Sequence, residues 1–180
     1  MSSGTIRLSV KPYIDRAKLS DITLSNEEIG RWVKTALRSS CKLLRDYART
    51  HHRYKDITGR LTKGIRYNVS DGTRSKNVQN WYGKVGYVNA DADARPEYAK
   101  WQLLGTGLYG AHRTEVVPKS ASFLRFKGTH GQWKNRWFSL RSARGIKGQD
   151  YLRNALVKNR AKIDEIFEET LQMMLKHKKG

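Results

Sequence analysis

The chain of 180 residues has a single cysteine, Cys41, and three prolines. A lone cysteine cannot form a disulfide within the chain, which fits synthesis in a reducing compartment. The sequence also lacks an apolar run approaching the ~20 residues that a membrane-spanning helix needs. Its first residues lack the apolar core of a signal peptide. We therefore expect a protein that is neither secreted nor embedded in a membrane.

Acidic residues are also scarce. The chain has 16 Asp and Glu against 36 Lys and Arg, so its formal net charge is +20 and its pI is about 10.3. Charge of one sign in such excess opposes compaction unless counter-charge lies nearby. The composition therefore predicts a polyanionic partner, most simply nucleic acid, with acidic protein partners as the alternative.

Motifs for catalysis are missing as well. The five histidines form no H-x-x-x-H motif and no Cys/His pair at the spacing of metal ligands, so we expect no metal site. The acidic residues of 164–169 have the spacing of a solvated helix face. Asp91 and Asp93 lack the Lys or His partner motif of a catalytic site, and a nuclease that uses them is a third alternative. We expect no catalytic residue and no cofactor.

The glycine-rich stretch YAKWQLLGTGLYG, residues 98–110, needs a separate interpretation. A dinucleotide-binding G-x-G-x-x-G motif follows a strand and precedes a helix. Here the order is reversed, because Pro96 suits the first turn of a helix and the glycines follow the apolar residues. The glycines therefore predict the end of a helix and not a phosphate-binding loop.

The N-terminal half begins with a polar stretch. Residues 1–24 contain one strand-like piece, IRLSV, and we expect an extended arm that a partner orders. Ser25 and Glu28 have the spacing of a capping box and predict a helix that ends at about His51. Cys41 lies on the apolar face of that helix, so we expect a small buried side chain and not a nucleophile.

The middle of the chain alternates between apolar and polar residues. Residues 65–70 and 81–88 predict an antiparallel hairpin with a long basic tip. Shorter strands are expected at 115–118, 122–126 and 136–140. From Asp150 onward, a single apolar stripe at helical spacing predicts one helix that runs to the C-terminus.

These elements predict an α+β fold. Long N-terminal and C-terminal helices should pack on a small, mainly antiparallel β-sheet of about four or five strands, in a single domain over 25–180. We expect the side chains of Leu61, Ile65, Trp101 and Leu104 to be buried and to attach the middle helix to the sheet.

Four cations lie in polar or glycine-containing loops beyond the expected strands. They are Arg74, Lys76, Lys127 and Lys134, and we expect them to contact DNA phosphates or a partner protein. Aromatic residues interleave with other Lys and Arg residues, a pattern typical of single-strand binders. Alternation within strands turns many of these rings toward the core, so we expect most of them to be core residues. Base stacking is the alternative.

Three motifs, taken in order, resemble a known family. They are ITGRLTKGI at 57–65, YAKWQLLGTG at 98–107 and GIKGQDYLRNA at 145–155. The order of elements is similar to that of bacteriophage neck or tail-completion proteins. It consists of a long helix, a D-T-G-x-L-like segment, a hairpin, an aromatic helix that ends in glycine, and a leucine-rich helix. These proteins are the head–tail joining or minor tail components of long-tailed phages. The resemblance spans roughly residues 25–175.

The resemblance implies a structural virion protein without enzymatic activity. Such proteins form a ring, a hexamer or a dodecamer, around the DNA channel and join the head connector to the tail. The implied partners are adaptor or stopper proteins of the connector, tail-tube or tail-terminator proteins, and the genomic DNA in the lumen, with no membrane. The implied location is the virion, after assembly in the bacterial host cytoplasm. A free basic protein that binds RNA or single-stranded DNA is the alternative.

Overall fold

The structure is a computed structural model that describes residues 5–10, 25–54, 59–75, 78–87, 96–128 and 131–179. The fold is α+β, as the sequence predicts. The single domain expected over 25–180 stays a prediction. By its internal contacts the chain divides into two compact units, one of Met1–Pro96 with Tyr151–Gly180 and one of Glu97–Asp150. We call them unit 1 and unit 2.

Unit 1 is built on a three-stranded antiparallel sheet. Its strands are β1 (Thr5–Val10), β2 (Arg66–Ser75) and β3 (Val78–Gly86), in the order β1-β3-β2. The predicted hairpin is therefore confirmed as β2–β3. Its strands extend further than expected, so only residues 76–77, which lie outside the described residues, separate them.

Part of the expected N-terminal arm belongs to this sheet. Thr5 pairs with Gly86 and Val10 with Trp81, so β1 forms the edge beside β3 within the same chain. Residues 11–24 of the expected arm lie outside the described residues. The alternating IRLSV segment explains the pairing, because it offers β3 a strand of matching pattern.

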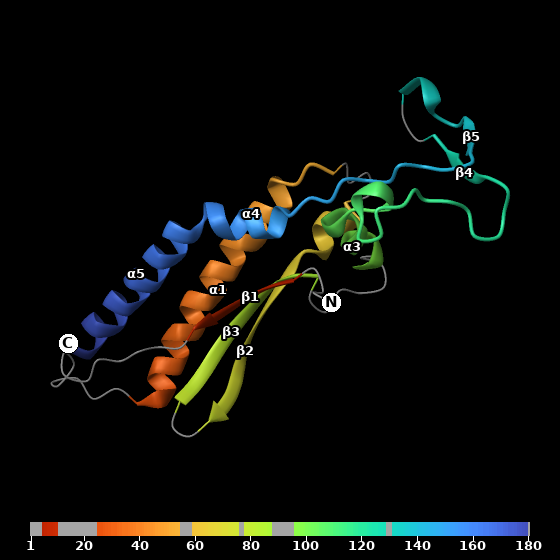
Figure 1. Ribbon diagram of the computed structural model, residues 1–180. Coiled ribbons are helices and arrows are strands. Elements are labelled where there is room, and N and C mark those ends of the chain that lie inside the picture. The colour runs from red at the N-terminus through yellow and green to blue at the C-terminus, as the bar shows by residue number, and fades with distance from the viewer. Residues whose placement is uncertain are drawn as a thin grey trace. The chain divides into compact units, whose positions relative to one another are not determined.

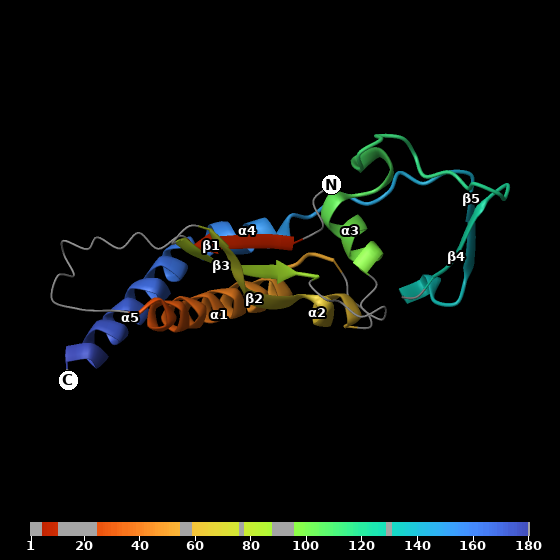
Figure 2. The same ribbon diagram turned by 90° about the horizontal axis from the view of Figure 1, so that it is seen from below.

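Helix α1 (Asn26–Thr50) runs along the sheet and packs on β2 and β3 (Figure 1, Figure 2). Its predicted capping box is confirmed. The Glu28 amide donates to Ser25 Oγ at 3.2 Å, and the Ser25 amide donates to Glu28 Oε2 at 2.9 Å. These bonds satisfy amides that a helix start would otherwise leave unpaired.

The C-terminal segment forms two helices where the sequence predicts one. They are α4 (Tyr151–Lys158) and α5 (Arg160–Lys179), and both pack on α1. Asn159 lies between them: its side chain is buried, and its Nδ2 donates to the Ala155 carbonyl at 2.8 Å. Helical hydrogen bonds continue across this residue, since the Asn159 amide donates to the Ala155 carbonyl at 3.1 Å and the Ile163 amide donates to the Asn159 carbonyl at 3.0 Å.

The core of unit 1 lies between α1, the sheet and α5. Ile29, Leu37 and Trp81 form its centre, with the partly buried Leu8, Val33, Val69 and Phe167 packed around them. The Cys41 side chain is buried, as predicted.

The short helix α2 (Arg60–Gly64) also contributes buried side chains. Leu61 within it and Ile65 directly after it are buried, which confirms the predicted burial of both residues. Arg49 fixes α2 to α1, since its guanidinium donates to the Ile65 carbonyl at 2.7 Å.

Unit 2 contains α3 (Pro96–Leu104), two short 3-10 turns and the hairpin of β4 (Leu124–Lys127) and β5 (Trp137–Leu140). The expected helix beginning at Pro96 is confirmed, as are strands close to 122–126 and 136–140. The strand expected at 115–118 is reduced to one bridge between Val116 and Ala143.

The glycines after α3 end the helix and bring two backbone segments together. Gly105 has φ +79° and its amide donates to the Trp101 carbonyl at 2.9 Å, which closes the last turn. The Thr106 amide then donates to the Ile146 carbonyl at 2.9 Å. A Cβ on Gly145 would overlap the Thr106 carbonyl, so the approach requires glycine there. The motif is a helix terminator, as predicted.

Candidate interaction surfaces

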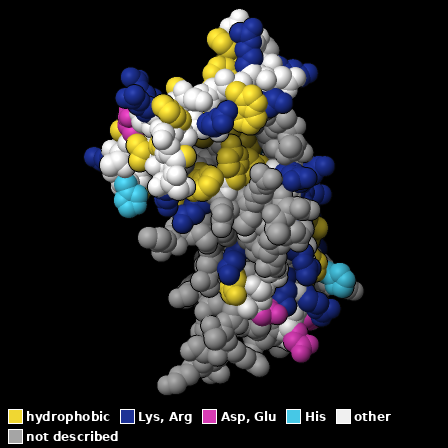
Figure 3. Space-filling model, turned by 90° about the vertical axis from the view of Figure 1, so that its right-hand side faces the viewer, with side chains coloured by type: hydrophobic (Ala, Val, Ile, Leu, Met, Phe, Trp, Pro, Cys, Tyr) yellow, Lys and Arg dark blue, Asp and Glu magenta, His cyan; other side chains and the backbone are white. Residues whose placement is uncertain are grey.

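Unit 2 exposes most of its apolar side chains. Among the described residues of Glu97–Asp150, Ala99 is the one apolar side chain that counts as fully buried. Thirteen large apolar residues there are exposed: Tyr98, Trp101, Leu104, Leu108, Tyr109, Val116, Val117, Phe123, Phe126, Trp133, Trp137, Leu140 and Ile146. In Figure 3, hydrophobic side chains lie beside Lys and Arg side chains on this surface. Exposed apolar area on this scale makes unit 2 a candidate interaction surface.

The prediction that Trp101 and Leu104 are buried is wrong. Their exposed fractions are 49% and 55%. The buried face of α3 is formed instead by Ala99 and Gln102, and the Gln102 carbonyl accepts a hydrogen bond from the Gln149 amide at 2.9 Å. The small Ala99 side chain and the Gln102 amide can approach the backbone at Gln149 closely. The bulky Trp101 and Leu104 side chains therefore turn outward.

The β4–β5 hairpin has two chemically different faces. Phe126 pairs with Phe138 and Lys127 with Trp137, and successive residues of a strand point to opposite faces. One face is therefore apolar, with Leu124, Phe126, Phe138 and Leu140. The other carries Arg125, Lys127, Trp137 and Ser139.

Ring contacts organise both faces of the hairpin. Phe126 and Phe138 stack with centroids 5.3 Å apart, and Trp133 meets the Phe138 ring edge-on at the same separation. On the opposite face, the Arg125 guanidinium lies 5.7 Å from the centre of the Trp137 ring, a cation–π distance. Trp137 is nevertheless 64% exposed, so its ring remains available to a partner.

Two of the four predicted contact cations belong to this hairpin. Lys127 ends β4, and Lys134 lies in the connection to β5; both are exposed. Arg74 belongs to β2 in unit 1, and its side chain lies outside the described residues, as does Lys76 as a whole. The structure thus brings together Lys127 and Lys134 and leaves the placement of the other two side chains undescribed.

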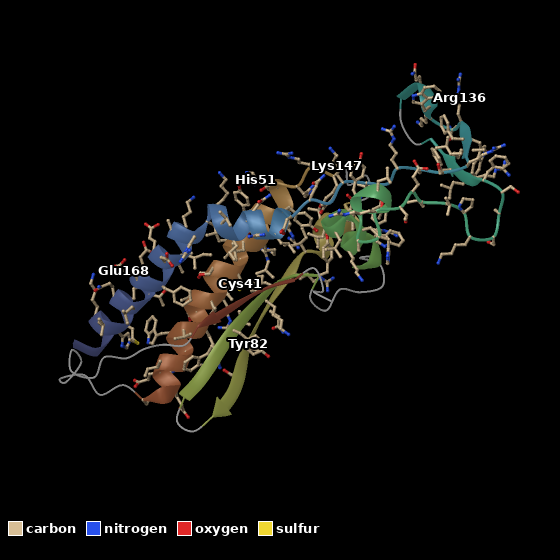
Figure 4. All side chains as sticks on the ribbon, in the orientation of Figure 1. Cys41, His51, Tyr82, Arg136, Lys147 and Glu168 are labelled. Carbon is tan, nitrogen blue, oxygen red and sulfur yellow. The ribbon has the colours of Figure 1, made fainter. Side chains whose placement is uncertain are left out.

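The sequence interpretation missed Arg125, whereas Arg136 and Arg141 were among the cations that interleave with aromatic residues. All three are exposed, and residues 124–141 contain five Lys and Arg and no Asp or Glu. Arg136 is labelled in Figure 4 beside the hairpin. The alternation in LRFK and WFSL could have revealed the two faces, since each segment is a short strand with period two.

The middle of helix α5 presents the opposite charge, between the cations Arg160 and Lys162 on one side and Lys176 on the other. Residues 163–175 contain four carboxylates, Asp164, Glu165, Glu168 and Glu169, and no Lys or Arg. All four are exposed, and within the described chain none forms an ion pair. The side chains of Glu165, Glu168, Glu169, Gln172, Met173 and Lys176 line an open hollow of about 470 Å³. Figure 4 shows Glu168 on this helix.

The titratable groups of unit 1 show structural roles. Burial raises the pKa of the Cys41 thiol to about 11, so the thiol is protonated at neutral pH and is a poor nucleophile. Both ring nitrogens of His52 are occupied, one near the Tyr54 carbonyl at 3.1 Å and one near Thr62 Oγ1 at 3.0 Å. Burial also raises the pKa of Tyr151, whose hydroxyl donates to the Tyr87 hydroxyl at 3.0 Å.

Other kinds of site find no support in the described part of the chain. There, no three His, Cys, Asp or Glu side chains gather as a metal site would require. The alternative nuclease pair, Asp91 and Asp93, lies outside the described residues. None of the described helices is long and apolar enough to cross a membrane.

Comparison with protein-family models, with curated proteins and with solved structures finds no match to this chain.

Proposed function

We propose that the protein is a structural subunit of the head–tail junction of a long-tailed bacteriophage. Copies join into a ring around the DNA channel and connect the head to the tail, without enzymatic activity. The observation that carries the proposal is the uncovered apolar surface of unit 2. A compact unit of this size with a single fully buried apolar side chain among its described residues gains too little from burial to be stable in water alone, so a partner must cover it.

The charge of the chain agrees with this location. Copies that each carry a formal charge of +20 repel one another unless an anion lies between or beside them. DNA in the lumen supplies such an anion, and acidic neighbours in the connector or the tail supply another. Contacts to a passing genome would be made with phosphates, because the genome presents every sequence in turn.

The order of sequence motifs supports the same assignment. Two of the three segments that resemble neck proteins, 98–107 and 145–155, meet in unit 2 through backbone hydrogen bonds. The Thr106 amide donates to the Ile146 carbonyl at 2.9 Å, and the Gln149 amide donates to the Gln102 carbonyl at 2.9 Å. Motifs that are far apart in the chain therefore build one local structure.

The experiment that tests the proposal has two parts. Native mass spectrometry of the purified protein should give a closed oligomer, a hexamer or a dodecamer. A phage that lacks the gene should accumulate filled heads and complete tails that do not join, and purified protein should restore joining in the extract. Joined, infectious particles without the gene would refute the proposal.

A second candidate function is favoured by the exposed tryptophans. Trp101, Trp133 and Trp137 all face solvent in a basic unit, an arrangement typical of proteins that stack single-stranded bases on aromatic rings. A free RNA- or single-strand-binding protein would be monomeric and would shift short oligonucleotides. The same native mass measurement separates the two functions.

A further inference from the structure

We infer that the β4–β5 hairpin of one copy binds the acidic face of α5 on a second copy. This inference rests on the proposed ring and names the surfaces that form its subunit contact. It assigns Lys127 and Lys134 to a neighbouring subunit and not to DNA.

The first argument is charge complementarity. Residues 124–141 carry five exposed cations and no acid, and residues 163–175 carry four exposed acids and no cation. The chain has 16 acidic residues, so a quarter of them lie in a segment of 13 residues. In a chain with so large an excess of cations, most pairings of two surfaces are repulsive. The pairing of hairpin with α5 is attractive.

The second argument is that both surfaces combine charge with exposed apolar groups. Trp137 is exposed on the same face of the hairpin as Arg125 and Lys127, and Leu171 and Met173 are exposed on α5. Charge steers such surfaces together, and burial of the apolar groups then supplies the lasting contact. The open hollow on α5, lined by Glu168 and Met173 among others, places carboxylates beside an apolar side chain.

The third argument is symmetry. A contact between two different surfaces of the same protein is heterologous, and such contacts build a ring when the rotation from copy to copy closes. A hairpin that paired with the hairpin of another copy would produce a dimer and would bring ten cations together. Hairpin-to-α5 docking thus gives each copy one donor surface and one acceptor surface, as a ring requires.

The experiment uses two charge-reversal variants of the full chain. The hairpin variant is Arg125→Glu with Lys127→Glu, and the helix variant is Glu165→Lys with Glu168→Lys. Each alone places like charges in the contact, so each should raise the protein concentration needed for half-assembly by roughly tenfold or more. A 1:1 mixture should recover assembly as rings in which the two variants alternate, because the reversed hairpin then meets the reversed helix.

A matched control reverses charges elsewhere in each unit. Lys100→Glu with Lys119→Glu changes two exposed cations of unit 2, and Glu27→Lys with Glu115→Lys changes two exposed acids. Both controls should assemble as the wild type does. Recovery in the mixture also excludes misfolding, because a variant that failed to fold could not be rescued by its partner.

Each contrary result has a distinct meaning. Wild-type protein that stays monomeric would overturn the ring and this inference together. Rings that tolerate both charge reversals, or a mixture that does not recover, would overturn the inference alone. A hairpin variant that assembles normally but no longer retains duplex DNA would show that the hairpin binds nucleic acid, which also overturns the inference.

Discussion

At the scale of single residues, Gly83 lies so close to Cys41 that no side chain fits between them. A Cβ placed on Gly83 would overlap Cys41 Sγ. We therefore expect Gly83→Ala to lower the free energy of unfolding by about 1–3 kcal/mol, the usual cost of overfilling a packed core. Urea unfolding of the wild type and the variant measures this change in the free energy of unfolding. The double variant with Cys41→Ala should lose less than the sum of the two single variants, and simple additivity would contradict the contact.

The Cys41 thiol also predicts a dependence of stability on pH. Its pKa in the folded protein is about 11, above the ordinary value of 9.0, because the thiolate would be buried. The contribution of the thiol to the free energy of unfolding is fully present below pH 9. It is lost as the pH rises toward 11, and the loss amounts to up to about 2–3 kcal/mol. Urea unfolding between pH 8 and 11 should show a steeper fall for the wild type than for Cys41→Ala. Equal slopes would contradict the burial.

At the scale of secondary-structure elements, the exposed face of α3 changes the expected cost of mutation. Trp101→Ala should lower the free energy of unfolding by less than about 1 kcal/mol in the monomer, because the ring is half exposed there. Leu61→Ala, a buried control, should cost about 2–5 kcal/mol. Thermal unfolding of both variants compares them. A large loss for Trp101→Ala would mean that the ring is packed.

The β4–β5 hairpin is expected to depend on assembly. Two strands of four residues are marginally stable in water without a further packed layer. Hydrogen exchange should therefore be fast at the amides of 124–127 and 137–140 in the monomer and at least tenfold slower in the ring. The β2–β3 amides, which lie against α1, are the internal control. Equal protection of the hairpin in both states would contradict this dependence.

How far the sequence predicts these elements depends on where their stabilising contacts come from. The α1 start at Ser25, the hairpin β2–β3 and the burial of Leu61 and Ile65 follow from local patterns: a capping box, alternation and a turn. The outward Trp101 and Leu104 do not, because the inward face of α3 is chosen by the backbone that returns at Gly148 and Gln149, forty residues away.

The boundary at Asn159 and the acidic face of α5 illustrate the same limit. The apolar stripe continues through Asn159, so periodicity alone predicts one helix and gives no sign of the boundary between α4 and α5. The acids of 164–169 were correctly predicted to lie on an exposed helix face. Their complementarity to the hairpin becomes visible only once the register of β4 and β5 shows which cations share a face.

At the scale of the whole molecule, the positive charge predicts binding of duplex DNA that weakens steeply with salt. Replacing Arg74 and Lys76 by Ser should reduce the slope of log K against log salt by about one to two if they contact phosphates. Lys158→Ser with Lys162→Ser removes the same charge elsewhere and is the control. An unchanged slope together with a block in particle joining would assign Arg74 and Lys76 to a protein partner.

Unit 1 is completed by two segments of chain that are separated by the whole of unit 2. During synthesis, α1 and the sheet leave the ribosome long before α4 and α5. At about 5–20 residues per second, the intervening 54 residues take roughly 3–11 seconds. Throughout that interval the apolar side of α1 that α5 will cover is bare, and the exposed rings of unit 2 emerge from the ribosome in the same interval. The nascent protein therefore passes through its most aggregation-prone state just before its last thirty residues appear.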